Sequence, residues 1–108
     1  MQEEDFVRAA LSVSGASQSS HFGKRDFRIQ NRIFATLPGE EVAVLKLTID
    51  QQAMAESLYP NWVSPVPKAW GAKGWTRLHL PSARLDAATH LLALAAGNVE
   101  KTAAKSGP

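Results

Sequence analysis

The sequence has 108 residues, of which 44% are hydrophobic and 20% charged, a composition typical of one globular domain with a single core. Its lack of cysteine excludes disulfide bonds, thiolate zinc sites and thiol nucleophiles, and suits a reducing cytoplasm, where we expect the protein to reside. The formal net charge of +2 is too small to indicate nucleic-acid binding by itself, and no apolar run reaches the ~18 residues of a membrane span.

The first predicted element is a helix over residues 2–13, because Phe6 and Val13 share one face at helical spacing and acids occupy the first turn. This acidic start differs from the basic start of a secretory signal. Gly15 is expected to end the helix. The segment SGASQSSHFG, residues 14–23, is rich in residues that favour turns, so we interpret it as a polar connection.

Alternating apolar and polar residues then predict a hairpin. Phe27 and Ile29 alternate with polar neighbours, which indicates a half-buried strand. Residues 30–31, Gln-Asn, can form the turn, and residues 33–37 return as the second strand. Residues 38–39, Pro-Gly, fit the centre of a type II turn, because glycine accepts the positive second backbone dihedral.

A third strand is predicted over residues 42–49, with Asp50 placed to cap a short helix that ends near residue 58. A brief strand at residues 62–63 should lapse at the prolines that follow, before a loop over residues 68–74. Clean alternation predicts another strand over 75–80, with Thr76, Leu78 and Leu80 on one face and Trp75, Arg77 and His79 on the other.

The last predicted helix runs from about residue 82 to residue 99, followed by a frayed tail over residues 101–108. Its apolar stripe comprises Leu85, Ala88, Leu92, Ala95 or Ala96, and Val99, widened by Leu91 and Leu94. The order of elements predicts one α+β domain over residues 1–108, with its ordered core at about 3–98. We expect a two-layer sandwich in which the terminal helices cover one face of a mainly antiparallel sheet and the other face is open.

No catalytic or metal-binding motif can be assembled from the sequence. The histidines, His21, His79 and His90, share no metal-ligand spacing with each other or with paired carboxylates. No serine lies in a nucleophile elbow, and the glycines form neither of the common phosphate-binding loops. We therefore expect a binding protein that is not an enzyme and carries no cofactor or metal.

The distribution of charge points to a candidate binding surface. No acid occurs from Ser57 to Leu85, and the segment over residues 66–80 combines two tryptophans, two lysines, an arginine and two glycines. Lys68, Lys73 and Arg77 are candidates for phosphate contacts, with Trp70 packing against bases. A second basic cluster consists of Lys24, Arg25, Arg28 and Arg32.

A structural interpretation of the same residues stays open. Trp70 and Trp75 can equally be core residues in a loop that glycines shape, and Phe22 and Phe27 are more often buried. The second basic cluster can be a solvated sheet edge that discourages aggregation.

The stretches HFGKRDFRIQNRIFATL, VAVLKLTID and VPKAWGAKGWTRLHL resemble the MmcQ/YjbR family over about residues 3–98. The most specific part is the segment from Pro67 to Leu80, with Trp70-Gly71 and Gly74-Trp75-Thr76 in the family's usual order. The resemblance implies a frataxin-like (CyaY-like) α+β sandwich and the double-wing DNA-binding role suggested for that family. It does not imply iron binding, because the first helix lacks an extended acidic ridge.

Two functions are therefore predicted. The first is weak, non-specific DNA binding through the basic tryptophan-containing segment. The alternative is a protein-interaction or small-ligand-binding domain that uses the open sheet face. The two differ in geometry, because nucleic-acid binding calls for Trp70 and the basic residues on one convex surface, whereas ligand binding calls for a pocket.

Overall fold

A computed structural model of the chain describes residues 1–39 and 41–105, with side chains through residue 100. The described strands form one six-stranded sheet in the order β1-β2-β3-β4-β6-β5, and every neighbouring pair is antiparallel. The elements in chain order are α1 (Glu3–Leu11), β1 (Ala16–His21), β2 (Lys24–Ile29), β3 (Arg32–Gly39), β4 (Val42–Lys46), α2 (Ile49–Leu58), β5 (Val63–Pro65), α3 (Ala69–Ala72), β6 (Trp75–His79), the 3-10 turn η1 (Leu80–Ser82) and α4 (Leu85–Lys105).

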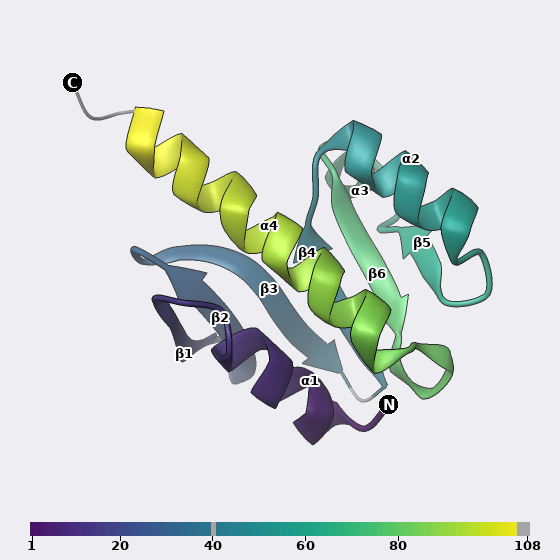
Figure 1. Ribbon diagram of the computed structural model, residues 1–108, viewed down its shortest axis with the longest axis horizontal. Helices are drawn as coiled ribbons and strands as arrows, with labels where there is room; N and C mark the ends of the chain where they lie inside the picture. Colours follow the sequence, from purple (N-terminus) through teal and green to yellow (C-terminus); the bar gives the residue numbers. More distant parts are fainter. Residues whose placement is uncertain (40, 106–108) are drawn as a thin grey trace.

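The two terminal helices cover one face of the sheet, which confirms the predicted α+β architecture. Helix α4 crosses β3 and β4, and α1 packs beside α4 (Figure 1). In the core between the layers, the fully buried rings of Phe6 from α1 and Phe27 from β2 meet edge to face at 6.0 Å. Leu91 and Leu92 on α4 are also fully buried, so the predicted stripe faces the sheet, although Leu85 at its start is 49% exposed. None of the described helices is both long and apolar enough to cross a bilayer.

Strand β1 corrects the prediction of a polar connection over residues 14–23. It pairs along its length with β2, and the hairpin turns at Phe22 and Gly23, which have φ values of 52° and 76°. Two positive φ values match the right-handed twist of a tight hairpin. The prediction missed this strand because an edge strand with mostly exposed side chains has no apolar alternation. The ring of Phe22 is 98% exposed at the turn, so its expected burial is also wrong.

The next turns confirm one prediction and correct another. Gln30 and Asn31 form the predicted β2–β3 turn, with φ values of 51° and 64°. Gly39, by contrast, lies in β3 and pairs with Val42, and the positive φ of 67° belongs to Glu41. The type II turn predicted at residues 38–39 is therefore wrong, and the chain reverses after Gly39.

Helix α2 begins earlier than predicted because Thr48 caps it. The Thr48 hydroxyl accepts from the amide of Gln51 at 3.1 Å, and the Gln51 side chain accepts from the amide of Thr48 at 3.0 Å. This reciprocal cap replaces the predicted Asp50 cap and ends β4 at Lys46, so Ile49 lies in the helix and is 50% exposed.

The two segments predicted to be irregular also contain helix. Residues 69–72 of the expected loop form the short helix α3. Helix α4 continues to Lys105, into the expected tail over residues 101–108, of which residues 106–108 lie outside the described part of the chain.

Candidate functional site

The sheet face opposite α1 and α4, here called the open face, carries alternate residues of the six described strands. Its centre is a row set by strand register, in which Asp26, Thr36, Val44 and Arg77 are successive partners across β2, β3, β4 and β6. This alternation places Phe27, Ala35, Leu45 and Thr76 on the opposite, helix-covered face. The open face also carries His21, Arg28, Lys46 and Trp75.

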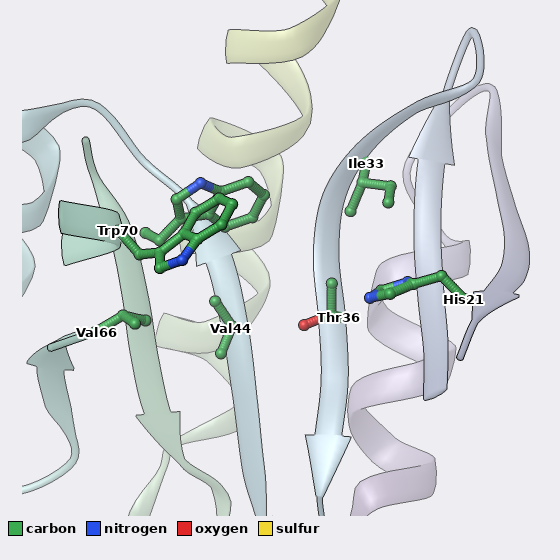
Figure 2. A pocket seen from close by; sticks show the side chains of 7 residues that line it. His21, Ile33, Thr36, Val44, Val66 and Trp70 are labelled. Atoms are coloured by element: carbon green, nitrogen blue, oxygen red, sulfur yellow. The ribbon is translucent and has the colours of Figure 1, made fainter. Parts of the chain in front are cut away.

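A pocket of about 290 Å³ lies on the open face. Trp70 and Trp75 form one wall, and His21 and Ile33 form the opposite wall. Thr36 and Val44 lie between the walls and Val66 lies on the tryptophan side, and Figure 2 shows these side chains coming from separate strands, from α3 and from the segment after β5. A second hollow, of about 400 Å³, shares Val44 and Val66 and extends to Arg77. The lining is almost entirely hydrocarbon and aromatic.

The tryptophan wall is held by tight backbone contacts around α3. A Cβ atom on Gly71 would lie 1.8 Å from the carbonyl oxygen of Val66, and one on Gly74 would lie 1.9 Å from that of Leu47. Gly74 also has a φ of +102°, which favours glycine. These glycines let α3 pack close enough to present Trp70 over the pocket. The Trp70 ring meets Trp75 edge to face at 6.1 Å and is 61% exposed.

Gln52 of α2 fixes the same wall from the covered side. Its buried amide nitrogen lies 3.1 Å from each of three acceptors, the carbonyl oxygens of Gly71 and Trp75 and the hydroxyl of Thr76, which share its two hydrogens. Because each acceptor lies beneath the pocket wall, a single α2 side chain ties α3 to β6. Nothing in the local sequence distinguishes Gln52 from its neighbour Gln51.

Two lysines flank the tryptophans. Lys73 Nζ lies 5.9 Å from the centre of the Trp70 ring, and Lys46 Nζ lies 5.3 Å from that of Trp75. Lys46 Nζ also donates to the carbonyl oxygen of Lys73 at 2.8 Å. Partial burial, followed by the positive charge of Lys73, lowers the pKa of Lys46. The wall therefore carries positive charge close to aromatic rings.

A buried carboxylate lies against His21 of the opposite wall. Asp26 is fully buried, and its Oδ2 lies 2.7 Å from Nδ1 of His21. Arg28 donates to the same carboxylate from Nε at 2.8 Å and from Nη2 at 3.1 Å. The hydrogen bonds from Arg28 are the largest cause of a lowered pKa for Asp26, with the bond to His21 adding to them against the effect of burial. Asp26 is therefore ionised at neutral pH.

Comparisons with known proteins establish the fold. No family model and no curated protein matches the sequence. Among solved structures, the crystal structure of the Deinococcus radiodurans protein DR2400, which has the family-model domain DUF419, is similar, with a TM-score of 0.67 and 14% sequence identity. The match covers 84% of this chain and 72% of that one. The two proteins share an α+β fold.

The residues predicted from the first basic segment gather around α3. Lys68 precedes the helix with a φ of 66°, Lys73 follows it, and Trp70 lies between them at the pocket. Arg77 lies on the open face beside Val44. Trp70 therefore lines a pocket, which is the geometry expected of the ligand-binding alternative.

The second basic cluster is divided between the two faces. Arg25 turns toward α1, where it pairs with Glu3 and, at 3.3 Å, with Glu4. Arg28 is on the open face but neutralises Asp26. Lys24 and Arg32 are exposed and form no ion pair with the described side chains.

Three groups at or beside the pocket were absent from the predicted site: His21, which lines it, and Asp26 and Lys46, which contact the lining residues His21 and Trp75. Strand register brings them together from β1, β2 and β4. The Phe22-Gly23 dipeptide is the one sequence signal that could have placed His21, because it marks a hairpin between two polar strands. No three His, Asp, Glu or Cys residues in the described part of the chain lie close enough to hold a metal ion.

Proposed function

We propose that the protein is a non-enzymatic binding domain whose open-face pocket accepts a small, planar, negatively charged molecule. The observation that supports this proposal most directly is the exposed ring of Trp70 at the rim of an apolar pocket. The pocket volume of about 290 Å³ is close to the lower end of the roughly 300–1,000 Å³ typical of small-molecule sites. Such sites combine apolar walls with a few polar groups that orient the ligand.

The preference for negative charge follows from the composition of the strands. Asp26 is the only acidic residue in the six strands, and Arg28 neutralises it. Lys46 and Lys73 lie beside the tryptophan rings, and Arg77 lies at the adjoining hollow. A carboxylate or phosphate on the ligand would therefore meet positive charge while its ring contacts Trp70 and Trp75.

The test is isothermal titration calorimetry with 1-benzothiophene-3-acetate, a flat aromatic anion, and with cyclohexylacetate, an anion without an aromatic ring. We expect the aromatic anion to bind more tightly, and Trp70→Ala to weaken its binding about 10-fold, as expected when one aromatic contact is lost. Leu58→Ala is the matched control, because Leu58 is a similarly exposed apolar residue on α2. Equal binding of both anions, or equal effects of both substitutions, would exclude this pocket as the site.

A second candidate function is binding of single-stranded nucleic acid on the same face. The pairing of Lys46 and Lys73 with tryptophan rings favours it, since single-strand-binding proteins combine base stacking with phosphate contacts. The pocket would then hold one base while the backbone follows the lysines and Arg77.

We also propose that the chain is a member of the MmcQ/YjbR family. Two observations support this assignment: the resemblance of the segment from Pro67 to Leu80, and the likeness to a DUF419 protein, whose domain is related to the MmcQ/YjbR-type fold. The test is an alignment of many homologues, in which the glycines of this segment, Gly71 and Gly74, should be kept because a Cβ atom does not fit at either position. Free substitution at both glycines would argue against the assignment.

A further inference from the structure

The wall formed by His21 gives the pocket a polar group of defined chemistry. Asp26 is an ionised carboxylate, which can accept hydrogen bonds but cannot donate them. At 2.7 Å from Asp26, Nδ1 of His21 must therefore carry the shared hydrogen. In a neutral imidazole with its hydrogen on Nδ1, the other ring nitrogen, Nε2, is a hydrogen-bond acceptor.

The imidazole is directed into the pocket. Figure 2 shows the His21 ring extending from its strand toward Thr36, with its far end at the pocket. Nε2 has no hydrogen-bond partner among the residues that the structure describes. The other polar side-chain groups of the lining are the indole N–H groups of Trp70 and Trp75, which only donate, and the Thr36 hydroxyl, which can donate as well as accept. Nε2 is therefore the one side-chain group of the lining that acts as an acceptor alone.

We propose that the His21–Asp26 pair makes the pocket selective for planar ligands whose ring carries an N–H or O–H donor. This inference rests on the proposed ligand-binding function and specifies the ligand class. A ligand with such a donor forms a hydrogen bond to Nε2. A ligand of the same shape without one covers Nε2 and leaves it unpaired, which weakens binding.

Arg28 keeps the His21–Asp26 pair in the arrangement that this selectivity requires. Its two hydrogen bonds hold the carboxylate of Asp26 in place and favour the ionised form, so that the hydrogen of His21 stays on Nδ1. Arg28 itself is held by Asn31, whose Oδ1 accepts from Nη1 at 2.9 Å. Arg28 and Asp26 are positioning residues, and His21 is the residue that would touch the ligand.

The experiment compares indole-3-acetate with 1-benzothiophene-3-acetate, in which sulfur replaces the ring N–H, by calorimetry at pH 8.5, where histidine is ordinarily neutral. For the unaltered protein we expect about 10-fold tighter binding of the indole, the size of one hydrogen bond at a partly exposed site. His21→Asn should remove this preference while keeping a side-chain N–H for Asp26. His21→Phe should remove it while keeping a flat ring.

The outcomes separate this inference from the proposed function. If neither probe binds the unaltered protein, the proposed function fails and the inference fails with it. If both probes bind equally, the pocket is a ligand site and the selectivity inference alone is wrong. A preference for the indole that persists in either folded His21 variant also overturns the inference, because another group would then accept the hydrogen bond.

Discussion

At the residue scale, Asp26 affects both the pocket wall formed by His21 and the stability of the fold. Its carboxylate is fully buried yet ionised, because Arg28 and His21 both donate to it. An isolated buried carboxylate would instead be neutral, since burial favours the uncharged form. The same contacts that prepare His21 for a ligand therefore also link folding to pH.

We predict that this linkage destabilises the protein in acid. The folded pKa of Asp26 is lower than its unfolded value, so its contribution is fully present above about pH 4 and is lost as pH falls through the folded pKa. Asp26→Asn should lower the free energy of unfolding at pH 7 by about 2 kcal/mol, because hydrogen bonds to a charged group are lost. Urea unfolding between pH 7 and pH 3 should show the difference from the unaltered protein shrinking. A difference that stays constant across this range would contradict the assignment.

Gly71 gives a second prediction at this scale. A methyl group there would overlap the carbonyl oxygen of Val66, so Gly71→Ala must displace α3. We expect a loss of about 1–3 kcal/mol of stability, the range for overpacked sites. Gly97→Ala is the matched control, because a Cβ there meets nothing within 4 Å and alanine favours the α4 helix by up to about 1 kcal/mol. Equal effects in urea unfolding would mean that α3 is not closely packed.

At the scale of elements, a helix or strand could be predicted from the sequence when its own residues carry the pattern that determines it. The β2–β3 hairpin, β6 and α4 were predicted because each has its own periodicity or turn residues. Strand β1 was missed because its side chains are mostly exposed and its pairing with β2 decides its structure. The site divides in the same way. Trp70 lies on α3 and Lys73 directly follows that helix, whereas the register of the sheet brings His21 to the pocket and Lys46 beside Trp75.

Helix α4 provides the prediction for this scale. Leu92 is fully buried in the middle of the stripe that packs on β3 and β4. Leu92→Ala should therefore lower the free energy of unfolding by about 2–5 kcal/mol, because it leaves a cavity. Leu85→Ala, at the half-exposed start of the same helix, should change it by only about 0.5 kcal/mol. A small effect at Leu92 would show that the helix packs on a different face.

For the whole molecule, the formal net charge of +2 conceals an uneven distribution. The strands contain one acid, while Glu3, Glu4 and Asp5 lie on α1, which covers the opposite face. Charge is thus segregated between the two layers, and this segregation gives the open face its basic character. An anionic partner of any size would meet that face first.

Salt dependence tests the nucleic-acid candidate. Each phosphate contact with single-stranded DNA contributes about −0.7 to the slope of log K against log[salt]. If Lys46, Lys68, Lys73 and Arg77 each make one such contact, the slope should be near −2.8. Lys68→Ala combined with Lys73→Ala should flatten this slope by about 1.4 without unfolding the domain. Lys24→Ala with Arg32→Ala is the control, since these residues lie outside the pocket. No binding at about 50 mM salt would exclude this candidate.

The three tryptophans occupy three different environments, so their intrinsic fluorescence can distinguish ligand binding from unfolding. Trp62 is buried and stacked on Tyr59 at 4.7 Å, Trp75 is half-buried in the pocket wall, and Trp70 is exposed at its rim. The emission of Trp70 should therefore be red-shifted and readily quenched by iodide, while that of Trp62 should be blue-shifted and protected. A molecule that enters the pocket should shield the quenchable fraction alone, whereas unfolding should expose all three indoles together.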